Sequence, residues 1–306
     1  MDLEIVKFVQ SGANNFFDFI LSMLTRFGEE IFFVSMFLIL YWAVNKVYAF
    51  KFVFFYLISY LINGGIKSIV DRPRPWHASS DVINKLEASN SSFPSGHSQS
   101  ISAISTFVVY DIYKSGKATK PIKYWSLGIA IAMCLIVGFS RIYLGQHYLT
   151  DVLAGLTLGF LVIFGLKFIA SKISPTIKSK FRCETVLSIL GIVVSCLVAV
   201  LSFNNFGLSA KTLNKVLRYG GMIVGYAIGY TASELVGNEP EISVWSKMIK
   251  VAVGFIVVFG LYILLSLVSA NIMYRFLVYV ICSIVATFVY PLIFNIAYKK
   301  NCEGII

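Results

Sequence analysis

Residues 248–270 read MIKVAVGFIVVFGLYILLSLVSA, and Lys250 is their single charged residue. A helix needs about 20 consecutive apolar residues to cross the hydrocarbon core of a bilayer. This stretch is long enough to cross, and similar apolar runs recur along nearly the whole chain. We therefore expect an all-α fold, a polytopic bundle of transmembrane helices.

The composition of the 306-residue chain supports this expectation. Hydrophobic residues make up 58% of the chain and charged residues 13%, and the mean hydropathy is +0.79. A soluble domain carries about 45–50% apolar and about 25% charged residues. The apolar excess is too large to bury in one water-soluble core.

The apolar runs predict about nine spans, at 31–45, 48–66, 97–113, 124–140, 147–167, 185–204, 218–236, 248–270 and 274–296. The third carries several serines, so we expect it to lie inside the bundle with its hydroxyls facing protein. The chain then divides into an N-terminal interfacial segment at 1–30, a five-helix core at 31–170 and a four-helix transmembrane extension at 171–306. The interfacial part rests on residues 14–27, where phenylalanines and aliphatic residues stand among polar ones, as in a helix that lies at the membrane interface.

Glycines in the extension predict close helix contact. Gly221, Gly225 and Gly229 recur at four-residue spacing, which places them on one helix face. Small residues on one face let the backbones of two membrane helices approach each other.

The net charge of +11 reflects loop lysines and arginines, and no separate basic domain exists to bind nucleic acid. Fifteen of the 26 basic residues fall in the odd-numbered connections or at the C-terminus. The positive-inside rule then places the N-terminus outside and the C-terminus in the cytoplasm. The five cysteines show no metal-ligand spacing, so we interpret them as packing residues.

Three polar clusters break the apolar pattern, all on the expected outer side. In the last cluster, residues 140–151, His147 and Asp151 stand four apart at the start of a helix, so they share one face. A carboxylate there can accept a hydrogen bond from one imidazole nitrogen, which fixes the tautomer and makes the other nitrogen a better nucleophile. The same spacing also occurs in ordinary surface pairs.

The other two clusters suit an anion. Pro94-Ser95-Gly96-His97 precedes a helix, and a helix start offers free N–H groups and a positive dipole end. Lys67, Arg72 and Arg74 form the first cluster, in which prolines fix the backbone around Arg74. Taken singly, residues 94–97 are also explained as a turn that caps a helix. The first cluster is also explained by contact with lipid headgroups.

Together with Arg141, these clusters supply fixed cations, backbone donors and two of the chain's three histidines. Such a combination suits a phosphoryl group in transfer. The remaining histidine, His77, is expected to be a loop residue. Arg72 and Asp71 are expected to pair with each other, or Arg72 to reach a second phosphate.

At these residues the chain resembles the type 2 phosphatidic acid phosphatases, lipid phosphate phosphatases related to vanadium haloperoxidases. The family pattern is Lys-x6-Arg-Pro, Pro-Ser-Gly-His and Ser-Arg-x5-His-x3-Asp, and residues 63–155 match all three parts in order. The resemblance implies a phosphohistidine mechanism without metal or other cofactor, in which His147 attacks phosphorus, Asp151 orients His147 and His97 protonates the leaving oxygen. The implied phosphate-binding groups are Lys67, Arg74, Ser95, Gly96 and Arg141.

We therefore expect a membrane phosphatase acting on a lipid phosphate or diphosphate, in a bacterial cell membrane with its active site facing outward. The candidate lipids are polyprenyl diphosphate, phosphatidic acid, phosphatidylglycerophosphate and sphingoid phosphates. The alternatives are a sugar-phosphate phosphatase, which the nine-span layout of glucose-6-phosphatase suggests, and a phosphotransferase with a lipid or sugar hydroxyl as acceptor. A transporter that merely binds anions is disfavoured by the complete three-part pattern.

Overall fold

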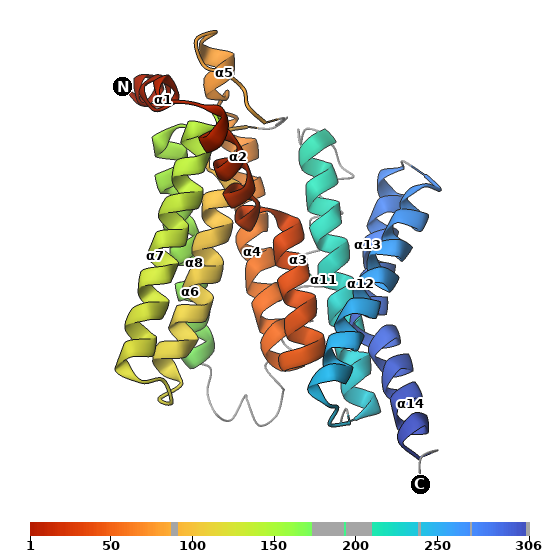
Figure 1. The fold of residues 1–306 in the computed structure, drawn as a ribbon. Coiled ribbons are helices and arrows are strands. Elements are labelled where there is room, and N and C mark those ends of the chain that lie inside the picture. Colours follow the sequence, from red (N-terminus) through yellow and green to blue (C-terminus); the bar gives the residue numbers. More distant parts are fainter. Residues whose placement is uncertain (87–90, 173–192, 194–209, 238–239, 270, 304–306) are drawn as a thin grey trace. The chain divides into compact units, whose positions relative to one another are not determined.

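The computed structural model describes residues 1–86, 91–172, 193, 210–237, 240–269 and 271–303. Within these residues every regular element is a helix, which confirms the all-α prediction (Figure 1). The α-helices are α1 (Asp2–Ser11), α2 (Asn15–Leu24), α3 (Glu30–Ile39), α4 (Lys46–Val70), α5 (Pro75–Ala78), α6 (Gly96–Lys114), α7 (Lys120–Tyr143), α8 (Leu149–Lys172), α11 (Ala210–Val236), α12 (Val244–Ser266), α13 (Ile272–Ile284) and α14 (Tyr290–Glu303). Three short helices of other types join them, namely η1 (Thr25–Gly28), η2 (Leu40–Val44) and η3 (Val285–Val289).

Five of the described helices are long and apolar enough to cross a membrane, or six if the bent pair Asn15–Gly28 and Glu30–Val44 counts as one broken span. The nine predicted spans are therefore not all confirmed. The predicted spans at 97–113 and 218–236 are helices, α6 and α11, but they are not among those five. The predicted span at 185–204 lies outside the described residues apart from residue 193.

The chain forms two compact units, which share α3 and α4. Unit 1 contains residues 1–33 and 55–173, and unit 2 contains residues 34–54 and 174–306. The predicted three-part division of the chain stays a prediction. All of the predicted site residues belong to unit 1.

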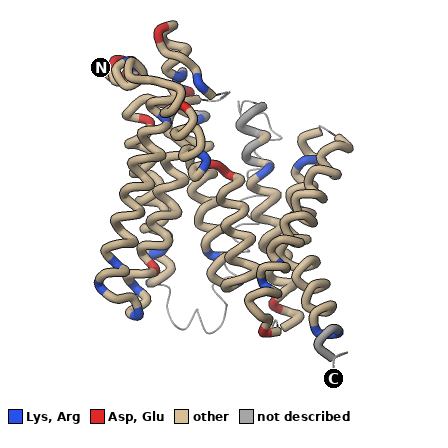
Figure 2. The backbone as a smooth tube through the Cα atoms, in the orientation of Figure 1, with Lys and Arg blue, Asp and Glu red and all other residues tan. Residues whose placement is uncertain are grey.

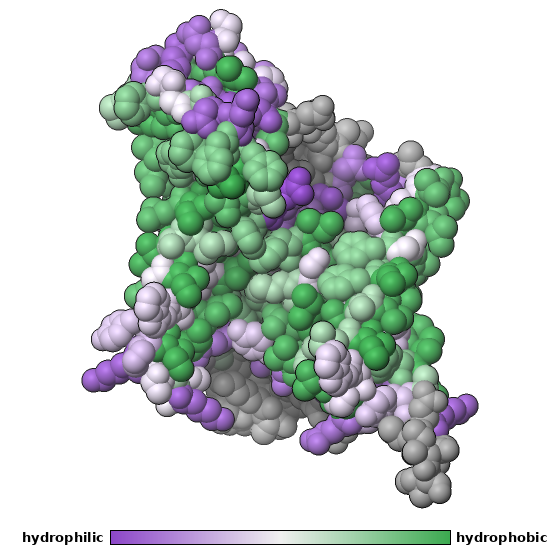
Figure 3. Space-filling model, in the orientation of Figure 1, coloured by the Kyte–Doolittle hydropathy of each residue, from purple (hydrophilic) through white to green (hydrophobic). Residues whose placement is uncertain are grey.

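The outer faces of α7 and α8 in unit 1 are apolar. Trp125, Ile131 and Leu135 of α7 and Leu161 and Phe164 of α8 are all exposed. In Figure 3 the flank of this unit is hydrophobic, and in Figure 2 its charges gather near the helix ends. This distribution suits helices surrounded by lipid.

Helix α6 is more polar than its neighbours, and its polar face is buried as predicted. Ser98, Ser100 and Ser102 are all buried, and the Ser102 hydroxyl donates to the Leu156 carbonyl of α8 at 2.7 Å. Protein groups thus satisfy hydroxyls that lipid could not.

Close packing of α8 on α6 depends on glycine. A Cβ atom at Gly155 would collide with the Ser95 carbonyl oxygen, and one at Gly159 with the Gln99 carbonyl oxygen. The two helix backbones therefore touch where α6 begins. This contact joins the start of α8, which carries Asp151 and directly follows His147, to the start of α6.

In unit 2, the predicted glycine stripe of α11 meets α13 and η3. A Cβ at Gly221 or Gly225 would clash with the carbonyl oxygen of Phe276 or Val280, and one at Gly229 with the side chain of Thr287. The prediction of close helix packing is confirmed. The interior of this unit also contains Lys250, which is 1% exposed and bonds to Asn295 at 3.3 Å.

The N-terminal residues form two helices. Asn14 caps α2 by accepting from the Phe17 N–H at 3.0 Å, and phenylalanines such as Phe16 and Phe19 are exposed on it. Helix α1, which we did not anticipate from the sequence, packs on the ends of α7 and α8 through Val6, which is 0% exposed.

Candidate active site

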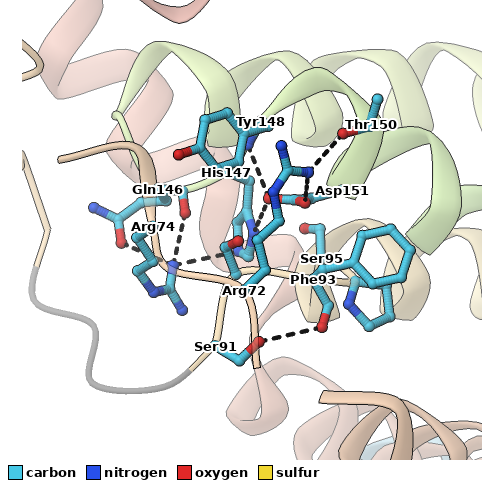
Figure 4. A network of polar contacts seen from close by, with 12 residues as sticks. Arg72, Arg74, Ser91, Phe93, Ser95, Gln146, His147, Tyr148, Thr150 and Asp151 are labelled. Carbon is cyan, nitrogen blue, oxygen red and sulfur yellow. Dashed lines mark hydrogen bonds and ion pairs between the residues drawn. The ribbon is translucent and has the colours of Figure 1, made fainter. Parts of the chain in front are cut away.

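The three polar clusters converge at one end of unit 1. Lys67 and Arg74 come from the end of α4 and the segment after it, Ser95 and His97 from the start of α6, and His147 from the turn between α7 and α8. Figure 4 shows how closely several of these groups lie. The geometry therefore assembles residues that are up to 84 positions apart, Lys67 and Asp151, in one place.

His147 and Asp151 face each other as their spacing predicts. The His147 Nδ1 atom lies 3.5 Å from Asp151 Oδ2, and the two side chains are 2% and 0% exposed. This is ion-pair distance and slightly too long for a hydrogen bond. Catalytic hydrogen bonds are often long without substrate and tighten when it binds.

The other nitrogen of His147 faces a cation. Arg74 Nη1 lies 3.5 Å from His147 Nε2. A guanidinium can only donate hydrogen bonds, so Nε2 must present its lone pair on that side. The proton of a neutral His147 then belongs on Nδ1, next to Asp151. This tautomer leaves the lone pair of the imidazole on Nε2, on the side away from Asp151.

Burial is the largest influence on His147. It lowers the pKa of the imidazole well below the ordinary 6.5, and the positive charges of Arg74, Lys67, Arg141 and His97 lower it further. A neutral imidazole, the form that can attack phosphorus, is therefore favoured at neutral pH.

Arg74 is buried but remains a cation. Burial lowers its pKa to about 10, while the Asp151 charge acts in the opposite direction. Its Nη1 atom donates to the backbone carbonyl of Gln146 at 2.8 Å. The guanidinium is thus held beside the His147 imidazole.

Lys67 and Arg141 are also held in place by protein oxygens. Lys67 Nζ donates to the Ser91 carbonyl at 2.7 Å, and Arg141 Nη1 donates to the Thr25 hydroxyl at 2.9 Å. Both side chains are less than a tenth exposed. Together with Arg74 they form a cationic group around His147, and the charge of each of the three lowers the pKa of that imidazole.

Ser95 caps the start of α6. Its hydroxyl accepts from the Ser98 N–H at 3.4 Å, and its own N–H donates to the Asp151 carbonyl at 2.9 Å. An anion at this helix start would therefore meet the N–H of Gly96, which has no partner within the helix, rather than that of Ser95. His97, in the same first turn, is half-buried against Gly28.

Two residues of this region, Gln146 and Asp2, were not recognised in the sequence, and Arg72 has other partners than the expected Asp71. Gln146 is 0% exposed and links Arg74 to the loop residues Asn84 and Leu86. Arg72 pairs with Asp151 and Asp2 instead of Asp71. The position of Gln146 within the third motif could have indicated that it belongs to the site. No neighbouring sequence feature indicates this for Asp2.

His77 falls in the short helix α5, where its ring contacts that of Trp76. No group of three or more His, Cys, Asp or Glu side chains suited to a metal ion occurs in the described part of the chain.

Comparison with known proteins identifies both halves of the sequence. Residues 48–174 match the sequence model of the PAP2 superfamily, and residues 217–300 match that of the PAP2 superfamily phosphatase transmembrane extension. Every residue of the predicted site lies in the first match.

Individual relatives are more distant. The chain is 35% identical over 113 residues to phosphatidylglycerophosphatase B of Bacillus subtilis, covering 37% of this chain and 53% of that protein. It is 29% identical to undecaprenyl-diphosphatase BcrC of the same species, covering 54% of this chain and 81% of that protein. A crystal structure of a transmembrane PAP2-type phosphatidylglycerolphosphate phosphatase from Bacillus subtilis is 26% identical, with a TM-score of 0.49, covering 57% of this chain and 86% of that chain. The match thus spans about half of the first relative.

Proposed function

This chain belongs to the PAP2 superfamily, and on that premise we propose that it is an integral membrane phosphatase that hydrolyses a lipid phosphate or diphosphate. The observation that carries the proposal is the environment of His147. Its Nε2 atom faces Arg74, and its Nδ1 atom faces Asp151. A neutral imidazole between a cation and a carboxylate is arranged to attack an anionic phosphoryl group.

The proposed reaction has two steps. His147 Nε2 attacks phosphorus, a P–N bond forms, and the bond to the leaving oxygen breaks as His97 donates a proton to that oxygen. Water then attacks the phosphohistidine, His97 takes a proton from the water, and the P–N bond breaks to release phosphate. Asp151 stabilises the imidazolium that forms when Nε2 is substituted.

No phosphoryl oxygen receives a proton from the protein in this scheme. Fixed hydrogen-bond donors must therefore balance the negative charge of these oxygens. We assign this role to Lys67, Arg74, Arg141 and the Gly96 N–H at the start of α6, because the Ser95 N–H already donates to the Asp151 carbonyl. Held side chains lose little freedom when substrate binds and need no rearrangement in the transition state. The bonds from Lys67 to Ser91 and from Arg141 to Thr25 supply this preorganisation.

Two observations support a lipid as the substrate, namely the names of the relatives and the location of the site at the ends of membrane-type helices. The relatives are named as phosphatases of phosphatidylglycerophosphate and undecaprenyl diphosphate. The site lies at the ends of helices whose flanks are apolar, so a headgroup there would leave its acyl or prenyl chain beside lipid-facing helices. We propose that this end faces outward.

The charge distribution supports this orientation. At the opposite end of unit 1, Lys114, Lys117, Lys120 and Lys123 lie in a stretch without any acidic residue. Two loop cations at the active-site end pair with acids, Lys7 with Asp81 and Lys85 with Asp18, and at the opposite end Lys167 of α8 pairs with Asp111. Unbalanced positive charge is the signal for the cytoplasmic side.

The test is phosphate release by purified protein in detergent. The panel holds phosphatidylglycerophosphate, phosphatidic acid, a polyprenyl diphosphate, a sphingoid phosphate and glucose 6-phosphate, with His147→Ala as control. We expect turnover of at least one lipid, no turnover by the variant, inhibition by orthovanadate and full activity in EDTA. Preference for the sugar phosphate, or activity that EDTA removes and a divalent metal restores, would contradict the proposal.

A further inference from the structure

Asp151 is held on the side away from His147 by Arg72. Arg72 Nη1 donates to Asp151 Oδ1 at 2.8 Å and to the Thr150 hydroxyl at 2.7 Å. The other carboxylate oxygen, Oδ2, accepts from the Tyr148 N–H at 2.9 Å and faces His147. The carboxylate is thereby fixed at both oxygens, as Figure 4 shows for the Arg72 side.

Arg72 is in turn held by the N-terminal helix. Its Nη2 atom donates to Asp2 Oδ2 of α1 at 2.9 Å, and its guanidinium lies 3.8 Å from the centre of the Tyr148 ring. Asp2 also accepts from the N–H and the hydroxyl of Thr150. Burial acts to raise the pKa of Asp2, but the bonds from Thr150 and Arg72 outweigh it and lower that pKa.

Helix α1 does not depend on Asp2 alone for its position. Gln10 exchanges hydrogen bonds with the backbone of Ile83 at 2.9 Å and donates to the Tyr143 carbonyl at 3.0 Å. Lys7 bonds to Asp81 at 2.8 Å, and Val6 is fully buried. A change at Asp2 can therefore weaken the link to Arg72 while the helix stays docked.

We propose that Asp2 and Arg72 are positioning residues for catalysis, and that Asp2 acts through Arg72 to hold Asp151 against His147. The proposal rests on the function proposed above. Neither side chain is assigned a phosphoryl contact. Without its bond to Asp2, Arg72 is free to move away from Asp151. The Asp151 carboxylate then loses this partner and is free to turn away from the imidazole. Because the link comes from α1, the N-terminal helix is part of the active site.

A set of uncharged variants tests the link. Asp2→Asn keeps the size of the side chain and removes its charge, Arg72→Gln removes the guanidinium, and the double variant combines them. Glu4→Gln is the matched control, because Glu4 lies on the same helix, is 71% exposed and pairs only loosely, at 3.7 Å, with Lys7.

Loss of a partner that orients a metal-bound imidazole typically costs about 10- to 100-fold in metal affinity or activity, and we take the same range for the imidazole of His147. We expect Asp2→Asn to lower kcat at the low end of that range and Arg72→Gln at the high end, with KM changed less than about twofold. The double variant should be no worse than Arg72→Gln, since Asp2 acts through Arg72. Glu4→Gln should match the wild type, and the melting temperatures of all four should stay close together.

Several results would overturn the proposal. These are equal kcat for Asp2→Asn and Glu4→Gln, losses that multiply in the double variant, or a loss of kcat that simply follows a fall in melting temperature. A rise of KM in Arg72→Gln for a diphosphate but not for a monoester would instead make Arg72 a substrate contact.

Orthovanadate affinity, measured by thermal shift, separates this proposal from the proposed function, because vanadate needs His147 but no lipid. Weaker vanadate binding in Asp2→Asn and Arg72→Gln than in Glu4→Gln supports the link even if no lipid is hydrolysed. Lipid turnover with unchanged vanadate affinity and kcat in both variants would leave the function standing and refute the link.

Discussion

At the scale of the residue, the environment of His147 defines its chemistry. Arg74 on one side and Asp151 on the other select one tautomer, and burial keeps the imidazole neutral. The same buried cations that favour the neutral nucleophile are suited to bind the anionic substrate. Attraction of substrate and activation of the nucleophile thus have a common electrostatic origin.

The two histidines that we propose to be catalytic, His97 and His147, should respond differently to the leaving group. General acid catalysis is worth roughly 10²–10⁴-fold, so His97→Ala should lose about that much kcat on an alkyl phosphate. It should lose clearly less on para-nitrophenyl phosphate, whose leaving group is a stabilised anion. His147→Ala should lose turnover of both esters. Steady-state rates on the two substrates measure this, and equal losses for His97→Ala would mean that it holds the phosphoryl group instead.

The low pKa of His147 can be observed directly. The chain contains three histidines, so a variant with His77→Ala and His97→Ala leaves His147 as the single titrating imidazole. Because burial and then the charge of Arg74 lower its pKa, we expect its nitrogen NMR signals to titrate well below pH 6.5. Protonation therefore begins only as the pH falls through that lowered value. A midpoint at or above 6.5 would contradict the inferred environment.

At the scale of the element, the contact between α8 and α6 determines how far apart the site residues at the starts of these two helices lie. Gly155 packs against the backbone of Ser95 and Gln99. These residues lie at the start of α6, the helix that carries His97. Gly165 lies on the same helix α8 with nothing within 4 Å of the position of its Cβ. The two glycines form a natural pair for comparison.

Gly155→Ala should separate α8 from α6 and cost about 1–3 kcal/mol, the usual cost of overpacking. Activity should fall as well, since Ser95 and His97 move away from His147. Gly165→Ala should match the wild type or gain up to about 1 kcal/mol from higher helix propensity. Thermal unfolding and kcat in detergent give both readouts, and similar behaviour of the two variants would show that the close contact is not required.

At the scale of the whole molecule, orientation decides which substrate pool the enzyme meets. Ile83 is exposed at the active-site end of unit 1, and Lys117 is exposed between α6 and α7 at the other end. Both lie outside the candidate spans, so each can report on one side of the membrane.

In a background without native cysteines, we expect Ile83→Cys in intact cells to react with an impermeant maleimide. Lys117→Cys should react only after the membrane is opened, because we propose from the positive-inside rule that its lysine-rich loop lies in the cytoplasm. Labelling followed by mass spectrometry records the outcome. The opposite pattern would place the active site inside.

The sequence by itself determined the all-helical membrane architecture and the three motifs. Apolar runs report burial in lipid directly, and the His147–Asp151 pair follows from one turn of helix, so both depend on local geometry. Span number was harder to determine, because buried serines make α6 too polar for a simple hydropathy criterion although it lies within the bundle.

Tertiary structure alone decided the partners of these motifs. Asp2 meets Thr150 across 148 residues, and Arg72 meets Asp151 across 79. No periodicity links such distant positions. The first contact exists only after α1 docks on the ends of α7 and α8, and the second only after the segment that follows α4 packs on the start of α8. The identity of Gln146 and Arg72 as supports of the site likewise follows from packing, which brings together groups that the chain keeps apart.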